Sequence, residues 1–435
     1  MPKTASTHLP KTGSTLVKKV HGFSEYKLAN NLTFLYKEIP GTKVVTTNIV
    51  YKAGSIDEDN GETGVAHMLE HMMFKPTLYD KKRKQKESAV INFEQETGIN
   101  LNASTWRDRT NYHFTMGSDH LNRALSIEAE RMRGLVLDDK EFQPERSNVL
   151  SEYDMYNSQP EFALSAAMQA AAFVSHPYRH ETIGWREDIA NYKINTLKNF
   201  YDRFYRPDNA VLIICGDVKE NIALEAVINT LGQIKAPNIP LIHRQIIEPK
   251  QEGERRVTVK RPGTVNLWSV GVKHQGLPHS AWYETLALFE ILAGGPESWL
   301  YRHLVDTGLV SSINYSIEPT RETNLATITL TLSETTTAQK VESKFFDLIK
   351  RLDQIELKRK LPAQIAKLEY EKIKTKDSSY ELATVLTEFV TNGNWTSYFD
   401  TVSQIKSLTA AKVDNRKKLL FAEHNLTIGN FASQP

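Results

Sequence analysis

Apolar and polar residues alternate in short runs through the first half of the chain, a pattern typical of strands. Strands are predicted at residues 32–38, 44–53, 99–105, 111–116 and 210–216, with a turn at Gly41 pairing the first two. Apolar residues at helical spacing predict helices at residues 64–74, 119–135, 141–157, 161–174 and 194–204, the third with Pro144 in its first turn. The mixture predicts an α+β domain, a mostly antiparallel sheet packed with helices.

A second series of elements repeats this order in the rest of the chain. Its strands are predicted at residues 265–273, 308–314 and 325–332, and its helices at residues 283–292 and from Leu361 onward. The stretch Tyr205-Arg-Pro-Asp-Asn209, which precedes a strand, has a counterpart in Phe421-Ala-Glu-His-Asn425. Two homologous domains of roughly 200 residues therefore indicate an internal duplication, because the period is too long for a solenoid.

The same pattern predicts where the domains begin and end. Residues 1–20 are expected to be a disordered leader, and residues 21–236 a first α+β domain. Residues 237–254 contain prolines and mixed charge, as a linker does. Residues 255–435 are expected to form the second α+β domain.

Composition and charge exclude several classes of protein. A net charge of +2 gives no signal for nucleic acid, and the basic run at residues 80–86 is better explained as a solvated surface. Cys215 is the only cysteine, which rules out an internal disulfide. No stretch approaches the ~20 apolar residues that span a bilayer. Residues 1–18 lack the apolar core of a signal peptide, so the protein is expected to be cytoplasmic if the chain is as made, and periplasmic if a signal was removed.

One helical stretch carries residues suited to metal chemistry. His67 and His71 stand four residues apart and share a helix face, which Glu70 borders. Two imidazoles at this spacing can both reach one zinc ion at about 2.0–2.1 Å, and a carboxylate beside them can take a proton from a metal-bound water. The alternative is a surface helix with two histidines, but the neighbouring apolar residues favour a buried helix: Val65, Met68, Leu69, Met72 and Met73.

Such a site needs a third ligand. Catalytic zinc sites use three protein ligands and leave one position for water. The helix that contains Pro144 offers three carboxylates: Glu145, Glu152 and Asp154. Glu145 and Glu152 are two turns apart on one face of that helix. Spacing alone leaves the three candidates open.

The motifs together resemble the pitrilysin family of zinc peptidases, which includes insulysin and the mitochondrial processing peptidase. The resemblance begins with His67-x-x-Glu70-His71, the inverted form of the zinc-protease helix motif, followed by Glu145-Arg-Ser-Asn-Val-Leu-Ser-Glu152. It covers about residues 25–430 and includes three further motifs: Asn102-Ala103-Ser104-Thr105, His176-Pro177-Tyr178 and Tyr205-Arg-Pro-Asp-Asn209. The internal duplication is also a property of that family.

The resemblance implies a role for each residue of the zinc motif. His67, His71 and Glu152 would bind one Zn²⁺ per chain, and Glu70 would be the catalytic base that activates a zinc-bound water. Glu145 would support the ligands without binding the metal, through a hydrogen bond to an imidazole. The alternative for Glu145 is an ordinary carboxylate near a helix start.

The resemblance also implies how substrate binds. Peptides or unfolded segments would lie along the open edge of one strand through main-chain hydrogen bonds. The substrate-binding residues would be Asn102, Ala103, Ser104 and Thr105.

The second half departs from the family's pattern. Ala287 and Ile291 stand where the histidines would be. Complete family members use an Arg and a Tyr of the second domain to hold substrate, and Val305 and Ser311 or Ser312 occupy those places. The chain is therefore expected to be the zinc-bearing subunit of a two-chain bacterial type, a heterodimer or higher complex with a homologous, zinc-free partner.

These observations predict a zinc metalloendopeptidase subunit. One alternative is a homologue that binds peptides or assembles a larger complex without cleavage, and another is a regulatory subunit with a structural zinc. The presence of His67, Glu70, His71 and Glu152 together argues against both, because neither needs a base beside three ligands.

Overall fold

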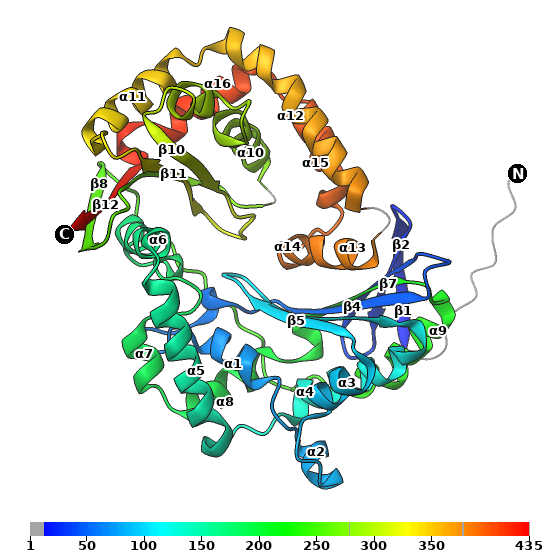
Figure 1. The fold of residues 1–435 in the computed structure, drawn as a ribbon. Helices are drawn as coiled ribbons and strands as arrows, with labels where there is room; N and C mark the ends of the chain where they lie inside the picture. Colours follow the sequence, from blue (N-terminus) through cyan, green and yellow to red (C-terminus); the bar gives the residue numbers. More distant parts are fainter. Residues whose placement is uncertain (1–12, 278, 376–377, 435) are drawn as a thin grey trace, which may run out of the picture. The chain divides into compact units, whose positions relative to one another are not determined.

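The computed structural model describes residues 13–277, 279–375 and 378–434 (Figure 1). They divide into two compact units, each assembled from separate pieces of chain. The first unit combines residues up to 147 with 187–243 and 375–391, and the second combines 148–186 with 244–374 and 392 onward. Among the described residues, no helix combines the length and the apolar character needed to cross a membrane.

A seven-stranded sheet forms the centre of the first unit, in the order β1-β2-β3-β7-β4-β6-β5. Its strands are β1 Ser14–Val20, β2 Phe23–Leu28, β3 Thr33–Glu38, β4 Val44–Tyr51, β5 Asn100–Thr105, β6 Thr110–Gly117 and β7 Ala210–Gly216. The predicted pairing of residues 32–38 with 44–53 is wrong, because β7 lies between β3 and β4. Every residue of β7, Cys215 included, is buried. Such an apolar strand buries most of its surface when it has a neighbouring strand on each side.

Helices cover both faces of this sheet (Figure 1). One face carries α1 Val65–Met72, α3 Ala89–Thr97, α4 Leu121–Gly134 and α8 Ile194–Phe204. The other face carries α13 Ser379–Val385 and α14 Thr387–Thr391, which come from late in the chain and pack on β4. The remaining helices of the first unit are α2 Leu78–Arg83, α7 Arg186–Asn191 and α9 Glu220–Asn229.

A five-stranded sheet forms the centre of the second unit, in the order β10-β11-β9-β12-β8. Its strands are β8 Arg255–Pro262, β9 Leu267–His274, β10 Val310–Ser316, β11 Asn324–Leu332 and β12 Leu426–Gln434. The order matches β5-β6-β4-β7-β3, and the β12–β8 pair is parallel, as the β7–β3 pair is. The predicted α+β fold with an internal duplication is thereby confirmed.

Helices of the second unit come from both halves of the chain. Helix α6, Pro160–Ala172, belongs to the first half of the sequence but packs on β8 and β12. The others are α10 Ser280–Ala293, α11 Ala338–Arg351, α12 Gln354–Lys374, α15 Ser397–Lys406 and α16 Ala410–Leu420.

Helix α5, Asp139–Asn157, starts earlier than predicted, so Pro144 lies inside the helix and not in its first turn. Helix α12 likewise begins seven residues before Leu361, with Pro362 inside it. In both cases proline removes one main-chain hydrogen bond but the flanking turns continue the helix.

The N-terminal prediction is only partly within the described residues. Residues 1–12 of the expected disordered leader lie outside them, whereas Ser14–Val20 is ordered as strand β1, paired with β2. The expected linker, residues 237–254, contains no helix or strand.

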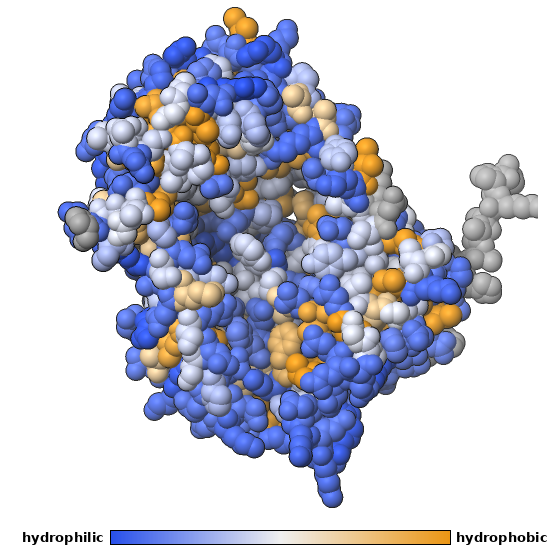
Figure 2. Space-filling view, in the orientation of Figure 1, coloured by the Kyte–Doolittle hydropathy of each residue, from blue (hydrophilic) through white to orange (hydrophobic). Residues whose placement is uncertain are grey.

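The basic run at residues 80–86 is a solvated surface with acidic neighbours. Lys81 pairs with Asp138 at 3.0 Å, and Arg83 pairs with Glu130 at 2.7 Å. Hydrophilic residues predominate on the face shown in Figure 2, and apolar residues form small groups there. Two cations of the run, Lys81 and Arg83, are therefore each paired with a carboxylate of the first unit.

Candidate metal centre

Helix α1 owes its position to its first turn and its apolar face. Gly64 adopts a left-handed conformation with φ 86°, which suits glycine. The Glu58 carboxylate accepts hydrogen bonds from the N–H groups of Gly64 at 2.8 Å and Ala66 at 2.9 Å, so the helix start is satisfied. The half-exposed residues of this helix are His67, Glu70 and His71, and its other residues are buried.

Three potential metal ligands converge beside this half-exposed face. One ligand atom from each of His67, His71 and Glu152 lies within 4.8 Å of the other two. Glu152 belongs to α5, a continuous helix that the division into units cuts after Ser147. The two imidazole rings are 4.7 Å apart and nearly perpendicular. Two neutral imidazoles and a carboxylate are the donor types that zinc prefers.

The structure distinguishes the three carboxylates that spacing left as candidates for the third ligand. Glu152 lies in the ligand cluster. Asp154 instead binds Arg186, which donates at 2.8 Å and 3.1 Å, and both are exposed. Glu145 contacts an imidazole, because its Oε1 accepts a hydrogen bond from His71 Nδ1 at 2.8 Å.

Glu145 controls the chemical state of His71. The hydrogen bond from His71 lowers the pKa of this buried carboxyl to about 2, and Lys75, 2.6 Å from Oε2, acts in the same direction against the effect of burial. A carboxylate accepts only, so His71 carries a proton on Nδ1, which leaves Nε2 as the nitrogen that could bind a metal. This tautomer fits a metal ligand whose second nitrogen is held by a carboxylate.

Glu70 contacts the strand that was expected to bind substrate. The hydroxyl of Thr105, the last residue of β5, donates a hydrogen bond to Glu70 Oε2. Among the described strands β5 has a neighbour on one side only, which makes it the edge of its sheet. The motif Asn102, Ala103, Ser104 and Thr105 therefore lies along an open edge that ends beside Glu70.

The phase of the β5–β6 pair identifies the residues that face this open edge. Trp106 N–H donates to the Arg109 carbonyl at 2.8 Å, and the register continues with Ser104 opposite Asn111. Because hydrogen-bonded pairs alternate in an antiparallel ladder, Ser104 and Asn102 point their main-chain groups toward β6. The main-chain groups of Ala103 point away from β6, and Asn102 Oδ1 accepts a hydrogen bond from the Ala103 N–H at 2.8 Å.

Two contacts of the cluster were not predicted from the sequence. The first is the ion pair between Lys75 and Glu145. Lys75 follows His71 by four residues, a spacing that places both side chains on one face of the helix. The hydrogen bond from Thr105 to Glu70 joins residues 35 positions apart, and no local pattern announces such a contact.

The second unit contains a counterpart without the imidazoles. Ala287 and Ile291 are buried in α10 at the positions of the two histidines. Glu290 corresponds to Glu70, and it accepts a hydrogen bond at 2.5 Å from Tyr315 of the edge strand β10. Lys367 lies 2.7 Å from the same carboxylate, which neutralises it within the second unit.

The residues expected at the places of the family's Arg and Tyr are small. Val305 ends a single π-helical turn, Tyr301–Val305, and Ser312 donates to the Thr331 hydroxyl at 2.8 Å. Nearby Arg302 pairs with Glu297 and, at 3.1 Å, with Asp306, all on the surface.

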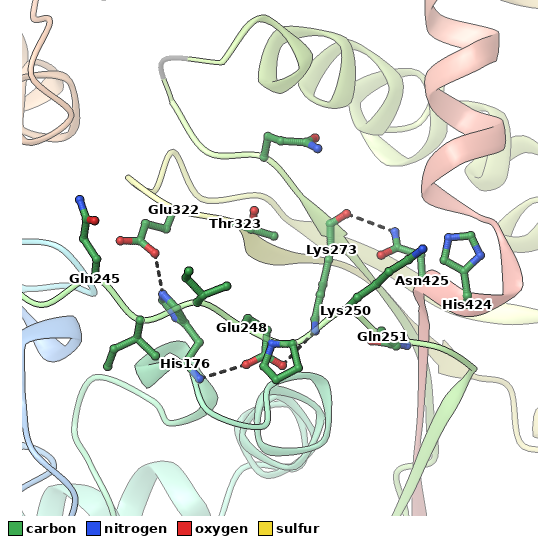
Figure 3. Close-up of a pocket in the computed structure, with 14 residues that line it drawn as sticks. His176, Gln245, Glu248, Lys250, Gln251, Lys273, Glu322, Thr323, His424 and Asn425 are labelled. Atoms are coloured by element: carbon green, nitrogen blue, oxygen red, sulfur yellow. Dashed lines mark hydrogen bonds and ion pairs between the residues drawn. The ribbon is translucent and has the colours of Figure 1, made fainter.

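A separate cavity of about 640 Å³ lies in the second unit (Figure 3). Its charged residues engage one another. His176 of the His-Pro-Tyr motif bonds to Glu322 at 3.0 Å, and Glu248 accepts main-chain N–H groups of Val174 and Ser175 and lies 3.4 Å from Lys273. These contacts hold the segment around Glu248 within the second unit. Among the described residues, no three side chains of this cavity are grouped as those of the α1–α5 cluster are.

Comparisons with known proteins agree with this geometry. The family model described as Insulinase (Peptidase family M16) matches residues 33–185, and the model described as Peptidase M16 inactive domain matches residues 192–361. A protein of Helicobacter pylori named zinc protease PqqE is 31% identical over 317 residues, 72% of this chain and 68% of that protein.

Two further relatives extend the comparison. A Schizosaccharomyces pombe protein named probable mitochondrial-processing peptidase subunit beta is 25% identical over 291 residues, 66% of this chain and 60% of that protein. A crystal structure of a protease from Helicobacter pylori has the same fold, with a TM-score of 0.89 and 24% identity over 98% of this chain and 100% of that one.

Proposed function

Because the chain belongs to the insulinase (M16) family of peptidases, we propose that it is a zinc metalloendopeptidase subunit that hydrolyses peptides or unfolded segments. The observation that carries the proposal is the convergence of His67, His71 and Glu152 within 4.8 Å. These three residues would hold the metal. A bound zinc would supply a Lewis acid that polarises the substrate carbonyl and lowers the pKa of a water.

Glu70 is the base of the proposed reaction. Its carboxylate borders the two histidines on α1 and takes a proton from the attacking water. The same carboxyl then returns this proton to the leaving amine. The hydroxyl of Thr105 holds one Glu70 oxygen, which keeps the base beside the end of β5.

Strand β5 is the proposed substrate site. An extended peptide would add to its open edge through main-chain hydrogen bonds with Ala103, which faces outward. Pairing through the main chain makes few demands on the substrate's side chains. The proposed substrates are therefore flexible polypeptides rather than folded proteins.

Partner dependence is a further part of the proposal. Val305 and Ser311 stand where the resemblance expects an Arg and a Tyr, and neither can donate a charged or phenolic hydrogen bond. A homologous, zinc-free chain would supply that pair.

The test compares wild type with Glu70→Gln by metal analysis and by cleavage of an unstructured peptide, with and without a homologous zinc-free chain. Glu70→Gln should bind one zinc per chain but lose about 10²–10⁴-fold in cleavage rate. Glu290→Gln makes the same change at the equivalent position of α10 and should leave cleavage unchanged. Zinc binding without cleavage under either condition would support the alternative, a peptide-binding or structural homologue.

A further inference from the structure

Helices α13 and α14 belong to the first unit, although more than 260 residues separate them from β5 and β6 in sequence. We propose that these two helices are a positioning element for the edge strand β5, with Glu388 and Arg109 as the positioning residues. The proposal rests on the proposed function, because β5 is the strand on which substrate is expected to lie.

The direct link is an ion pair between Glu388 of α14 and Arg109. Arg109 donates to Glu388 Oε1 from Nε at 2.8 Å and from Nη2 at 2.5 Å. The arginine is 6% exposed and the glutamate is half-buried, so the pair is partly shielded from water. Two donors on one carboxylate fix the plane of the guanidinium.

The remaining nitrogen of Arg109 reaches β5. Nη1 donates to the Ser104 carbonyl at 3.1 Å and to the Ser104 hydroxyl at 2.5 Å. It also donates to Asn111 Oδ1 at 2.6 Å, on the strand beside β5. One guanidinium therefore connects α14 to the residue that precedes Thr105, the donor to Glu70.

A second link runs parallel to the first. Asn111 donates to Asn48 Oδ1 at 2.9 Å, and Asn48 donates to the Ala383 carbonyl at 2.8 Å and to the Thr387 hydroxyl at 2.9 Å. All of these groups are buried, so each link is stronger than it would be in water. The two helices thus connect to β6 and β5 through side chains, in addition to the main-chain ladder between those strands.

An edge strand needs such support if it is to bind a peptide. Strand β5 has one neighbour among the described strands, and none of its six residues is fully buried. Its own ladder with β6 therefore leaves it easily displaced. A binding strand must be held within about 0.5 Å of its productive position to retain affinity. The network from Glu388 to Ser104 supplies this restraint from the face that α13 and α14 cover.

The test uses the full chain and measures two properties of Glu388→Gln. Hydrogen exchange should be about fivefold faster in the β5 amides bonded to β6, those of Asn102 and Ser104. Cleavage of an unstructured peptide, with the homologous zinc-free chain present, should show a KM raised about fivefold and a kcat changed much less, because binding rather than chemistry is weakened. Zinc content and melting temperature should remain those of wild type.

Two variants separate positioning from general packing. Glu381→Gln removes the same charge from an exposed position on α13 and should change neither measurement. Arg109→Lys keeps the positive charge but cannot reach Glu388, Ser104 and Asn111 together, so it should reproduce the defect of Glu388→Gln. The double variant should show the same hydrogen exchange and KM as either single variant, because both substitutions break the same link.

Unchanged exchange at β5 in Glu388→Gln and Arg109→Lys, with both variants folded, would overturn the proposal. Additive effects in the double variant would also overturn it. If wild type and Glu381→Gln fail to cleave or bind the peptide, the proposed function fails, and hydrogen exchange still decides whether α14 holds β5. If Glu388→Gln does not fold, Arg109→Lys decides the outcome.

Discussion

Glu145 shows how one carboxylate can prepare a metal ligand. Its Oε1 accepts a hydrogen bond from His71 Nδ1 and its Oε2 lies 2.6 Å from Lys75, so both of its oxygens face positive or donating groups. The hydrogen bond from His71 is the larger effect, and it holds the pKa of Glu145 at about 2. The carboxylate is therefore charged throughout the neutral range, and His71 keeps the tautomer that a metal requires.

Replacing this carboxylate by an amide should weaken metal binding without removing a ligand. Glu145→Gln loses the charge that stabilises His71 and the pairing with Lys75. We expect the zinc dissociation constant to rise about 10- to 100-fold, as measured by competition with a chelating dye at pH 7. Asp139→Asn, an exposed change on the same helix, is the control and should leave zinc affinity unchanged. Equal affinity in Glu145→Gln and wild type would remove Glu145 from the site.

At the residue scale, the sequence predicted what helical spacing determines. His67, Glu70 and His71 share one turn of α1, so their juxtaposition follows from local geometry. The choice among three carboxylates of α5 could not be made in this way, because it depends on Arg186 drawing Asp154 aside. The Thr105–Glu70 contact depends on how β5 meets α1, which no local spacing encodes.

At the scale of elements, β5 is the strand whose exposed edge matters. The main-chain groups of Ala103 face outward, whereas those of Asn102 face β6. A proline is tolerated in an edge strand where its missing N–H would point away from the sheet. Ala103→Pro should therefore fold normally but cleave an unstructured peptide about tenfold more slowly, since one substrate hydrogen bond is lost.

The matched change at the preceding position should have the opposite pattern. Asn102→Pro removes a hydrogen bond of the β5–β6 ladder, so it should lower the melting temperature of the first unit. Melting curves and peptide cleavage for the two variants distinguish these outcomes. Normal cleavage by a folded Ala103→Pro variant would show that substrate does not pair with this edge.

Strand β6 introduces a pH dependence into the stability of the first unit. Burial lowers the pKa of His113 to about 4, and nearby Arg131 acts in the same direction. The folded-state pKa is below the value of about 6.5 expected in the unfolded chain, so the neutral imidazole is favoured in the fold. The stabilisation is complete above pH about 6.5 and is lost as the pH falls toward 4.

The contribution of His113 to the unfolding free energy should therefore appear as a difference between pH 7 and pH 5. Over this interval the unfolding free energy of wild type should fall by up to about 2 kcal/mol more than that of His113→Gln. Urea denaturation at both pH values measures the difference. His424→Gln, at an exposed position, serves as control and should follow wild type. The same loss in wild type and His113→Gln would assign the pH dependence to other groups.

Element order was more predictable than element neighbours. The alternation of apolar residues located β4, β5, β6 and β7 closely, because burial of one or both faces sets that pattern. It could not place β7 between β3 and β4, nor bring α13 and α14 onto β4, because those contacts join segments more than 150 residues apart. Strands β1, β2, β8 and β12 were missed, and polar side chains cover much of β1 and β8.

At the scale of the whole molecule, the duplication places two versions of one arrangement in the chain. The five strands of the second sheet have the order of five strands of the first. In both sheets the hydroxyl of an edge strand donates a hydrogen bond to a glutamate of a helix earlier in the chain: Thr105 to Glu70, and Tyr315 to Glu290. In the second unit Lys367 neutralises that glutamate, and apolar residues replace the imidazoles. The counterpart site around Glu290 therefore repeats the glutamate and the edge-strand hydroxyl but lacks the two imidazoles.

The proposed absence of the substrate-holding pair predicts that activity needs a second chain. Val305 and Ser311 offer no charged or phenolic donor, and Arg302 is engaged with Glu297 and Asp306. A missing donor to the reacting carbonyl lowers the rate by about 10²–10³-fold, so the purified chain should cleave an unstructured peptide slowly. Adding a homologous chain that carries the Arg and Tyr but lacks the His-x-x-Glu-His motif should raise kcat/KM about 100-fold. The same partner with its Arg and Tyr replaced should bind equally well, by size-exclusion chromatography, but give no increase. Full turnover by the purified chain, unchanged by the partner, would mean that the groups which hold the substrate are already present on this one.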